Sequence, residues 1–159
     1  MCLALCLVLP FLTGQIREIG SMLCPMHLPV LLCGFLCGWP WGLAVGAVAP
    51  LLRSALFGMP PLFPIAVSMA AELAVYGLVT GLLSARLPKK FGWTYVSLIA
   101  AMLLGRVAWG LVRLLLAGLS GGAFTWAMFL SGALTTAIPG IIVQLILVPV
   151  IVTAVQKRV

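Results

Sequence analysis

Charged residues are scarce in this chain of 159 residues. They make up 7% of it, whereas hydrophobic residues make up 64%. An ordinary soluble domain has about a quarter of its residues charged, so the chain has too little polar surface to enclose a water-soluble core. The sequence therefore predicts an integral membrane protein. In such a protein each charge inside the hydrocarbon costs free energy, which makes the few charged residues informative.

Acids and histidine are scarcer still, with two acids and one histidine in the whole chain. A catalytic zinc site usually takes three such ligands, so a metal hydrolase is not expected. The chain also has no room for a nucleotide-binding domain beside about six spans of ~20 residues each. Any ATP-driven step must therefore come from a partner.

The cysteines do not form a recognisable motif. They lie at positions 2, 6, 24, 33 and 37, with no CxxC pair and no histidine at metal spacing. We interpret them as small apolar residues of membrane spans, which is a common role of free cysteine, rather than as a disulfide or a zinc site.

Apolar stretches predict a single all-α domain over residues 1–159, a bundle of six transmembrane helices. The first half is rich in proline, which indicates bent or broken helices there, with prolines among others at positions 25, 29, 40, 50, 60, 61 and 64. The predicted spans are about 1–13, 24 to a turn at 38–42, 43–57, 62–85, 95–118 and 129–155.

Basic residues set the predicted orientation. One cluster at 86–90 follows the fourth span and another at 157–158 follows the sixth. Two clusters separated by two spans fall on one side, which the positive-inside rule assigns to the cytoplasm. Both termini are then cytoplasmic, and the loops at 14–24, 58–61 and 119–125 face outward.

Three residues of the fifth span share one helical face. Arg106, Trp109 and Arg113 are spaced at i, i+3 and i+7. An arginine near the bilayer midplane costs about 3 kcal/mol, so this face should point into the bundle. Glu72 lies at similar depth in the fourth span, with Tyr76 one turn beyond. We expect a buried pair between Glu72 and Arg106, which either serves structure alone or forms the floor of a polar site.

Two arginines have no acidic partner in this scheme. Arg113 and Arg53, which lies near the outer end of the third span, leave positive charge in an outward-facing cavity. That charge favours an anion, and a carboxylate fits the guanidinium fork. For Arg53 the alternative is a side chain that reaches the outer headgroups. Uncharged hydrogen bonds are expected from Ser68, Thr135, Thr136 and Gln144.

The only histidine, His27, lies between two prolines after the first outward loop. It is either a hydrogen-bonded residue at a helix entry or a ligand or base. An intramembrane enzyme acting on lipid or peptide would have to use Ser131, His27 and Glu72, but no GxSxG motif accompanies Ser131. The chain is therefore not expected to be an enzyme. A stand-alone channel or scaffold is a third class of function.

The segments PMHLPVLLCG, APLLRS and RLPKK, within a chain of this length and span pattern, resemble the S component of an energy-coupling factor (ECF) vitamin transporter. The resemblance covers nearly the whole chain. It implies a high-affinity substrate-binding subunit of an ECF-type ABC importer in the plasma membrane. The chain would bind no cofactor and would topple beside a coupling subunit, powered by two ATPase subunits that use ATP.

The resemblance also implies a site walled by the last three spans and closed by residues 14–24 and 58–64. With an arginine excess, pantothenate is the first candidate and folate the next. Cobalamin and riboflavin remain alternatives, because Trp109, Tyr76 and Phe63 offer rings for stacking. The AxxxA-like contact pattern of the family's first span is imperfect here, with only Cys2, Ala4 and Cys6, so no docking residues are assigned.

Overall fold

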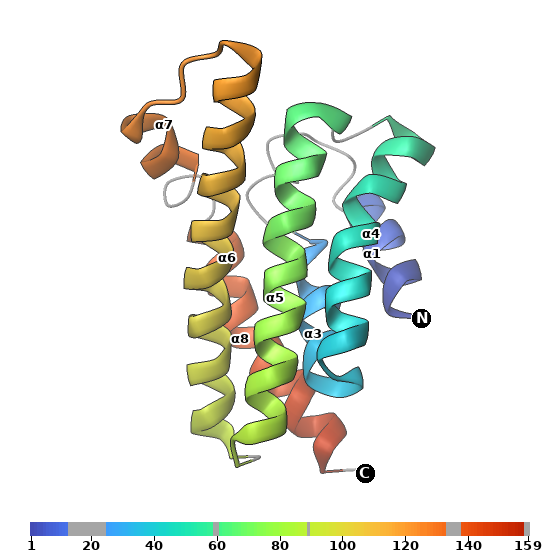
Figure 1. Ribbon diagram of the computed structural model, residues 1–159. Helices are drawn as coiled ribbons and strands as arrows, with labels where there is room; N and C mark the ends of the chain where they lie inside the picture. The colour runs from blue at the N-terminus through green and yellow to red at the C-terminus, as the bar shows by residue number, and fades with distance from the viewer. Residues whose placement is uncertain (13–24, 59–60, 89, 133–137, 158–159) are drawn as a thin grey trace.

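The computed structural model describes residues 1–12, 25–58, 61–88, 90–132 and 138–157, and these ranges form helices and connecting turns without a strand. They build an elongated bundle of upright helices (Figure 1), which confirms the all-α class. The elements are α1 (Cys2–Leu12), α3 (His27–Cys37), α4 (Trp39–Phe57), η1 (Leu62–Ala66), α5 (Val67–Arg86), α6 (Phe91–Ser120), α7 (Trp126–Leu130) and α8 (Ile138–Gln156).

The six predicted spans correspond to six apolar helices, but only four are long enough to cross a membrane alone. These are α4, η1 with α5, α6 and α8. The first two, α1 and α3, have 11 residues each. At 1.5 Å per residue they reach about 16 Å, half of the ~30 Å hydrocarbon core. The stretch between them, 13–24, lies outside the described residues.

Several predicted boundaries were wrong. The turn expected at 38–42 is made by Gly38 alone, whose φ of 92° suits a residue without Cβ, and α4 begins directly at Trp39. The fifth span is longer than expected, because α6 has 30 residues. The sixth was expected to begin at residue 129, whereas the structure has the short α7 over Trp126–Leu130 and describes α8 over Ile138–Gln156, with 133–137 outside the described residues.

The prediction of broken helices in the first half is confirmed at η1. Phe63 has an extended backbone there, with φ −121° and ψ 133°, so the helix that becomes α5 is interrupted next to Pro64. Proline removes a backbone donor and crowds the preceding turn, which explains this site. The chain nevertheless continues as one helix through Pro50 of α4.

Helix α5 is the central element, in contact with α3, α4 and α6. It packs closely on the antiparallel α4 through glycines. A Cβ on Gly77 would overlap the backbone of Gly42, and a Cβ on Gly46 would overlap that of Leu73. Each helix carries a GxxxG spacing, 42–46 and 77–81. Small residues at this spacing let backbones approach in a membrane, where helices have no hydrophobic force between them.

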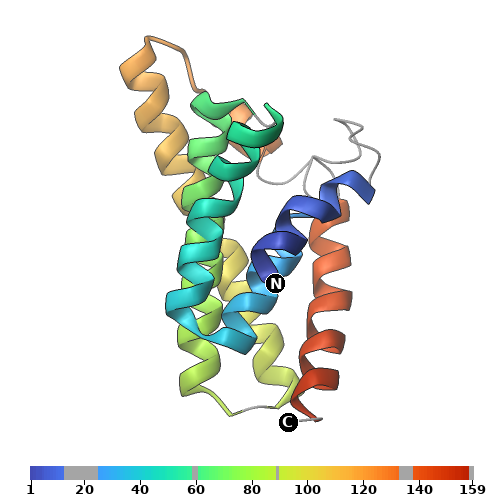
Figure 2. The same cartoon turned by 90° about the vertical axis from the view of Figure 1, so that its right-hand side faces the viewer.

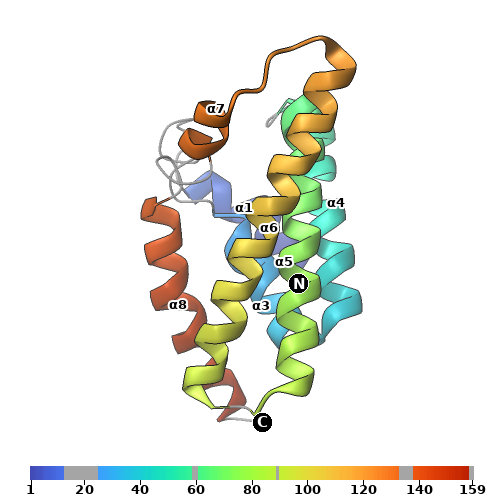
Figure 3. The ribbon, with the colours of Figure 1, turned by 60° about the vertical axis from the view of Figure 1, so that its left-hand side comes forward.

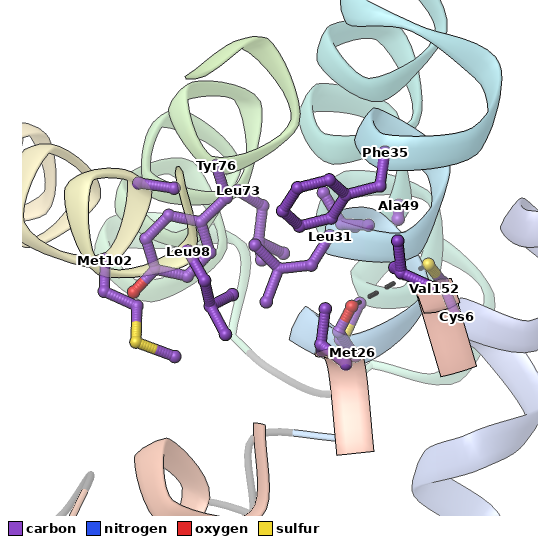
Figure 4. Packing of buried hydrophobic residues seen from close by; sticks show 13 residues of the cluster. Cys6, Met26, Leu31, Phe35, Ala49, Leu73, Tyr76, Leu98, Met102 and Val152 are labelled. Carbon is purple, nitrogen blue, oxygen red and sulfur yellow. Dashed lines mark hydrogen bonds between the residues drawn. The ribbon is translucent and has the colours of Figure 1, made fainter. Parts of the chain in front are cut away.

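Buried apolar side chains from α5 and five other helices form the core (Figure 4), among them Leu31, Phe35, Leu73, Leu98 and Val152. Helix α8 lies at the margin (Figure 2), where it contacts α3 and α6. The end of the bundle that holds Arg86, Lys90 and Lys157 is called the basic end below. In Figure 1 it is the lower end, near the C-terminus.

Candidate functional site

A buried carboxylate lies at the centre of the candidate site. Glu72 on α5 is 2% exposed. A guanidinium nitrogen of Arg106, on α6, lies 3.1 Å from its Oε1, and the hydroxyl of Tyr76 donates a hydrogen bond of 2.9 Å to the same oxygen. Tyr76 is one turn from Glu72, as the sequence indicated. The predicted Glu72–Arg106 pair is therefore confirmed.

His27 joins this group from α3, which the sequence did not predict. Its ring packs edge-on against Tyr76 with centroids 5.2 Å apart, and its Nε2 lies 3.6 Å from Glu72 Oε1, too far for a hydrogen bond. Both ring nitrogens are buried without a hydrogen-bond partner. A buried polar atom in this condition costs about 1–3 kcal/mol, so His27 is well placed to bind a further polar group.

Arg113 has a different environment, two turns along α6 from Arg106. Its guanidinium lies 5.7 Å from the ring centre of Trp109 and 5.8 Å from that of Phe124. Such cation–π contacts are favourable, but they add no counter-charge. Within the described residues no carboxylate pairs with Arg113, and its Nε is buried without a hydrogen-bond partner.

The segment after α6 completes this aromatic surround. It arches over the end of the bundle opposite the basic end (Figure 3). Phe129 of α7 lies 6.1 Å from Trp109 and stacks with Trp126 at 5.3 Å, and it also fills the space beside Gly110. The sequence analysis missed Phe124, Phe129 and Trp126. The sequence could have indicated them, because three aromatic residues lie within six positions in the segment that follows the helix with Arg106 and Arg113.

Arg53 lies apart from these residues. It is 6% exposed, its guanidinium donates a hydrogen bond of 3.0 Å to the Leu7 carbonyl, and it lies 5.4 and 5.6 Å from the rings of Phe11 and Phe57. These contacts join α4 to α1. A substrate role for Arg53 stays a prediction, whereas the observed contacts are those of a link between helices.

The remaining candidates occupy varied places. Gln144 is buried on α8 with 2% exposure. The Ser68 hydroxyl donates to carbonyls of its own helix, those of Pro64 and Ile65, which gives it a local role. Thr135 and Thr136 lie outside the described residues.

The arrangement suits binding better than nucleophilic catalysis. Ser131 directly follows α7, whereas His27 begins α3. A serine nucleophile needs a base within hydrogen-bond reach, and in the described part of the chain His27 has no hydrogen-bonded partner. The site instead offers one neutralised charge pair and one guanidinium that no carboxylate pairs among the residues that the structure describes.

The comparisons with known proteins agree with a binding role. A family model described as the substrate-specific component of ECF transporters matches residues 1–152 of the chain. No curated protein and no solved structure matches it.

Proposed function

Because the chain belongs to the substrate-specific components of ECF transporters, we propose that it captures an anionic vitamin or vitamin precursor for import, with pantothenate the first candidate. Membership makes it the substrate-binding membrane subunit of an importer, a family of transporter subunits rather than enzymes. It also implies association with ECF coupling and ATPase subunits and with a small-molecule substrate. The proposal concerns which substrate that is.

One observation carries the proposal, the position of Arg113. Of the arginines inside the bundle, Arg106 faces Glu72 and Arg53 binds the Leu7 carbonyl. Arg113 has aromatic faces on two sides and no carboxylate among the described residues. An arginine held in a partly buried aromatic surround is a strong partner for a carboxylate, because the fork binds both oxygens and the apolar walls exclude water.

The polar remainder of such a substrate would meet Glu72 with its neighbours Arg106, Tyr76 and His27, which are called the Glu72 group below. Pantothenate carries hydroxyl and amide groups besides its carboxylate. The unpaired nitrogens of His27 offer a donor and an acceptor to such groups. Arg106 and Tyr76 would hold Glu72 in place below the substrate, and Gln144 would contribute from α8. In this arrangement Arg113 binds the charge and the Glu72 group forms the floor.

Folate, which also carries carboxylates, is the second candidate. Cobalamin and riboflavin are larger or uncharged, and for them the rings of Trp109, Tyr76 and Phe63 would supply most of the contact. Tyr76 is 1% exposed and its hydroxyl is bound to Glu72, so it offers little free surface for stacking. This favours the anionic candidates.

We further propose that the protein lies in the plasma membrane with both termini in the cytoplasm, and that the partner ATPase subunits use ATP while this chain binds none. The basic end supports this orientation, since Arg86, Lys90 and Lys157 gather there. Arg113 then lies toward the outer face, from which a nutrient arrives.

Isothermal titration calorimetry of the purified chain against a panel of vitamins tests the proposal. We expect tight binding of one anionic member, pantothenate first. If only riboflavin or cobalamin binds, the substrate is one that binds by ring stacking, and the proposal of an anionic substrate is wrong. No binding to any member by a folded, monodisperse sample would contradict the proposed substrate class.

A further inference from the structure

Three cysteine thiols converge where α1 packs on α3. The Sγ atoms of Cys2, Cys33 and Cys37 all lie within 4.8 Å of one another. All three are free thiols. Cys2 is far from the other two in the sequence, with 30 residues between it and Cys33, so no spacing motif indicates the group.

The packing of the two helices explains the convergence. Cys33 and Cys37 are one turn apart and share a face of α3. Helix α1 packs on that helix in the antiparallel sense, since Cys6 lies against the carbonyl of Met26, at 3.9 Å, near the other end of α3. The start of α1 is thereby brought to the last turn of α3, which places Cys2 beside the other two thiols.

The distances suit a three-sulfur metal site. Thiolate ligands at ~2.3 Å from a shared ion lie about 3.8 to 4.0 Å from one another. The observed sulfurs need to approach by less than about 1 Å, which is within the range of small side-chain rotations. Cys33 is 2% exposed, whereas Cys37 is exposed and leaves a route for an ion to enter.

We propose that Cys2, Cys33 and Cys37 form a binding site for a thiophilic d10 cation such as Cu(I), Cd(II) or Hg(II). Only sulfur ligands belong to the group, and thiolates select soft ions over Mg²⁺, Ca²⁺ or Mn²⁺. Binding displaces the thiol protons, and the cation offsets the negative charge that the thiolates acquire. The ion would tie the start of α1 to the end of α3.

The position within the bundle favours this chemistry. Cys37 directly precedes Gly38 and Trp39, and Trp39 packs beside Gly81, near the end of α5 that carries Arg86. The thiols thus lie toward the basic end, on the side proposed to face the reducing cytoplasm, where thiols are kept available for metals. The site is separate from Arg113 and from the Glu72 group, so it is independent of the proposed vitamin.

Titration of the full chain in detergent with Cd²⁺ under reducing conditions tests the site, because cadmium–thiolate bonds give an ultraviolet charge-transfer absorbance. We expect one Cd²⁺ per chain, with proton release. Cys2→Ser and Cys37→Ser should each weaken binding at least tenfold, as should Cys33→Ser where it folds. Cys6→Ser is the matched control, since Cys6 is a buried thiol of α1 outside the group, and it should bind as the unchanged protein does.

Competition identifies the ion class. Cu(I) should displace Cd²⁺, whereas Mg²⁺ should not. Displacement by Mg²⁺, an unchanged affinity in Cys2→Ser, or an equal loss in Cys6→Ser would each overturn the proposal. Vitamin binding should be the same in all of these variants, so a failure of the metal site is distinguishable from a failure of the proposed substrate.

Discussion

At the scale of single residues, the protein treats its buried charges in two ways. Arg106 and Tyr76 both lie within hydrogen-bond distance of the Glu72 carboxylate. Arg113 lies against the rings of Trp109 and Phe124, and among the described residues no carboxylate pairs with it. Charge in a membrane interior is costly unless it is paired or used. The first arrangement is paired, and the second leaves a cation for a ligand to complete.

Replacement of Arg113 by alanine is expected to weaken an anionic vitamin by more than tenfold, because one charge-assisted hydrogen bond contributes about 1.5 to 3 kcal/mol. Calorimetry on the purified variant measures the change. Arg86→Ala removes an exposed arginine at the basic end and serves as the control, with unchanged affinity expected. Equal affinity of Arg113→Ala and the unchanged protein would refute the assigned role.

Glu72→Gln is expected to lower thermal stability strongly, since removal of one partner of a buried pair costs about 3 to 5 kcal/mol. The apparent melting temperature in detergent reports it. The double variant Glu72→Gln with Arg106→Gln has neither charge and should recover part of the loss. A single variant as stable as the unchanged protein would show that the pair is not a structural requirement.

The residue types and their depth sufficed to predict the Glu72–Arg106 pair, because the two opposite charges lay at similar depth in neighbouring spans. The place of His27 could not be predicted in this way. It depends on how α3 packs against α5, and no charge or residue spacing in the sequence indicates that contact. The environment of Arg53 could not be predicted for the same reason, because its hydrogen-bond partner is a backbone carbonyl of α1.

At the scale of elements, the contact between α4 and α5 is the most extensive helix packing in the described fold. Gly42 and Gly77 meet backbone to backbone there. The paired GxxxG spacings were visible in the sequence, but such spacings are common in membrane helices and do not name their partner. Helix ends were harder still. Gly38 alone separates α3 from α4, and α6 extends for 30 residues, because turns and caps depend on one or two residues.

Gly77→Leu is expected to destabilise the bundle, because a side chain at this position would overlap the backbone of Gly42 and force α4 away from α5. Size-exclusion chromatography after heating measures the loss of folded protein. Gly118→Leu is the matched control. It is also a helical glycine, nothing lies within 4 Å of its Cβ position, and leucine favours the helix more than glycine does. Equal stability of the two variants would contradict the packing account.

At the scale of the whole molecule, composition alone predicted the membrane class and the all-α bundle. The apolar stretches of the first half are each short for a span in the sequence, and the helices α1 and α3 have 11 residues each. Composition could not predict the exact bounds of these helices. It also could not bring Cys2 to Cys33 and Cys37. That convergence depends on the tertiary packing of α1 on α3.

The orientation has its own prediction. A fluorescent protein fused to the C-terminus should fluoresce in cells, whereas alkaline phosphatase at that position should be inactive. Alkaline phosphatase inserted at 121–125 should be active, because the loop after α6 is predicted to face outward and the basic end to face the cytoplasm. The reverse pattern of activities would invert the bundle and place Arg113 toward the cytoplasm.

The most direct test of the central claim compares pantothenate with its neutral alcohol analogue, which lacks only the carboxylate, in the unchanged protein and in Arg113→Ala. Calorimetry should show the alcohol more than tenfold weaker in the unchanged protein, since its charge-assisted hydrogen bond is missing. The two ligands should become nearly equal once Arg113 is gone. If the carboxylate advantage is absent in the unchanged protein, or persists in full without Arg113, the account of an anion held by this arginine is wrong.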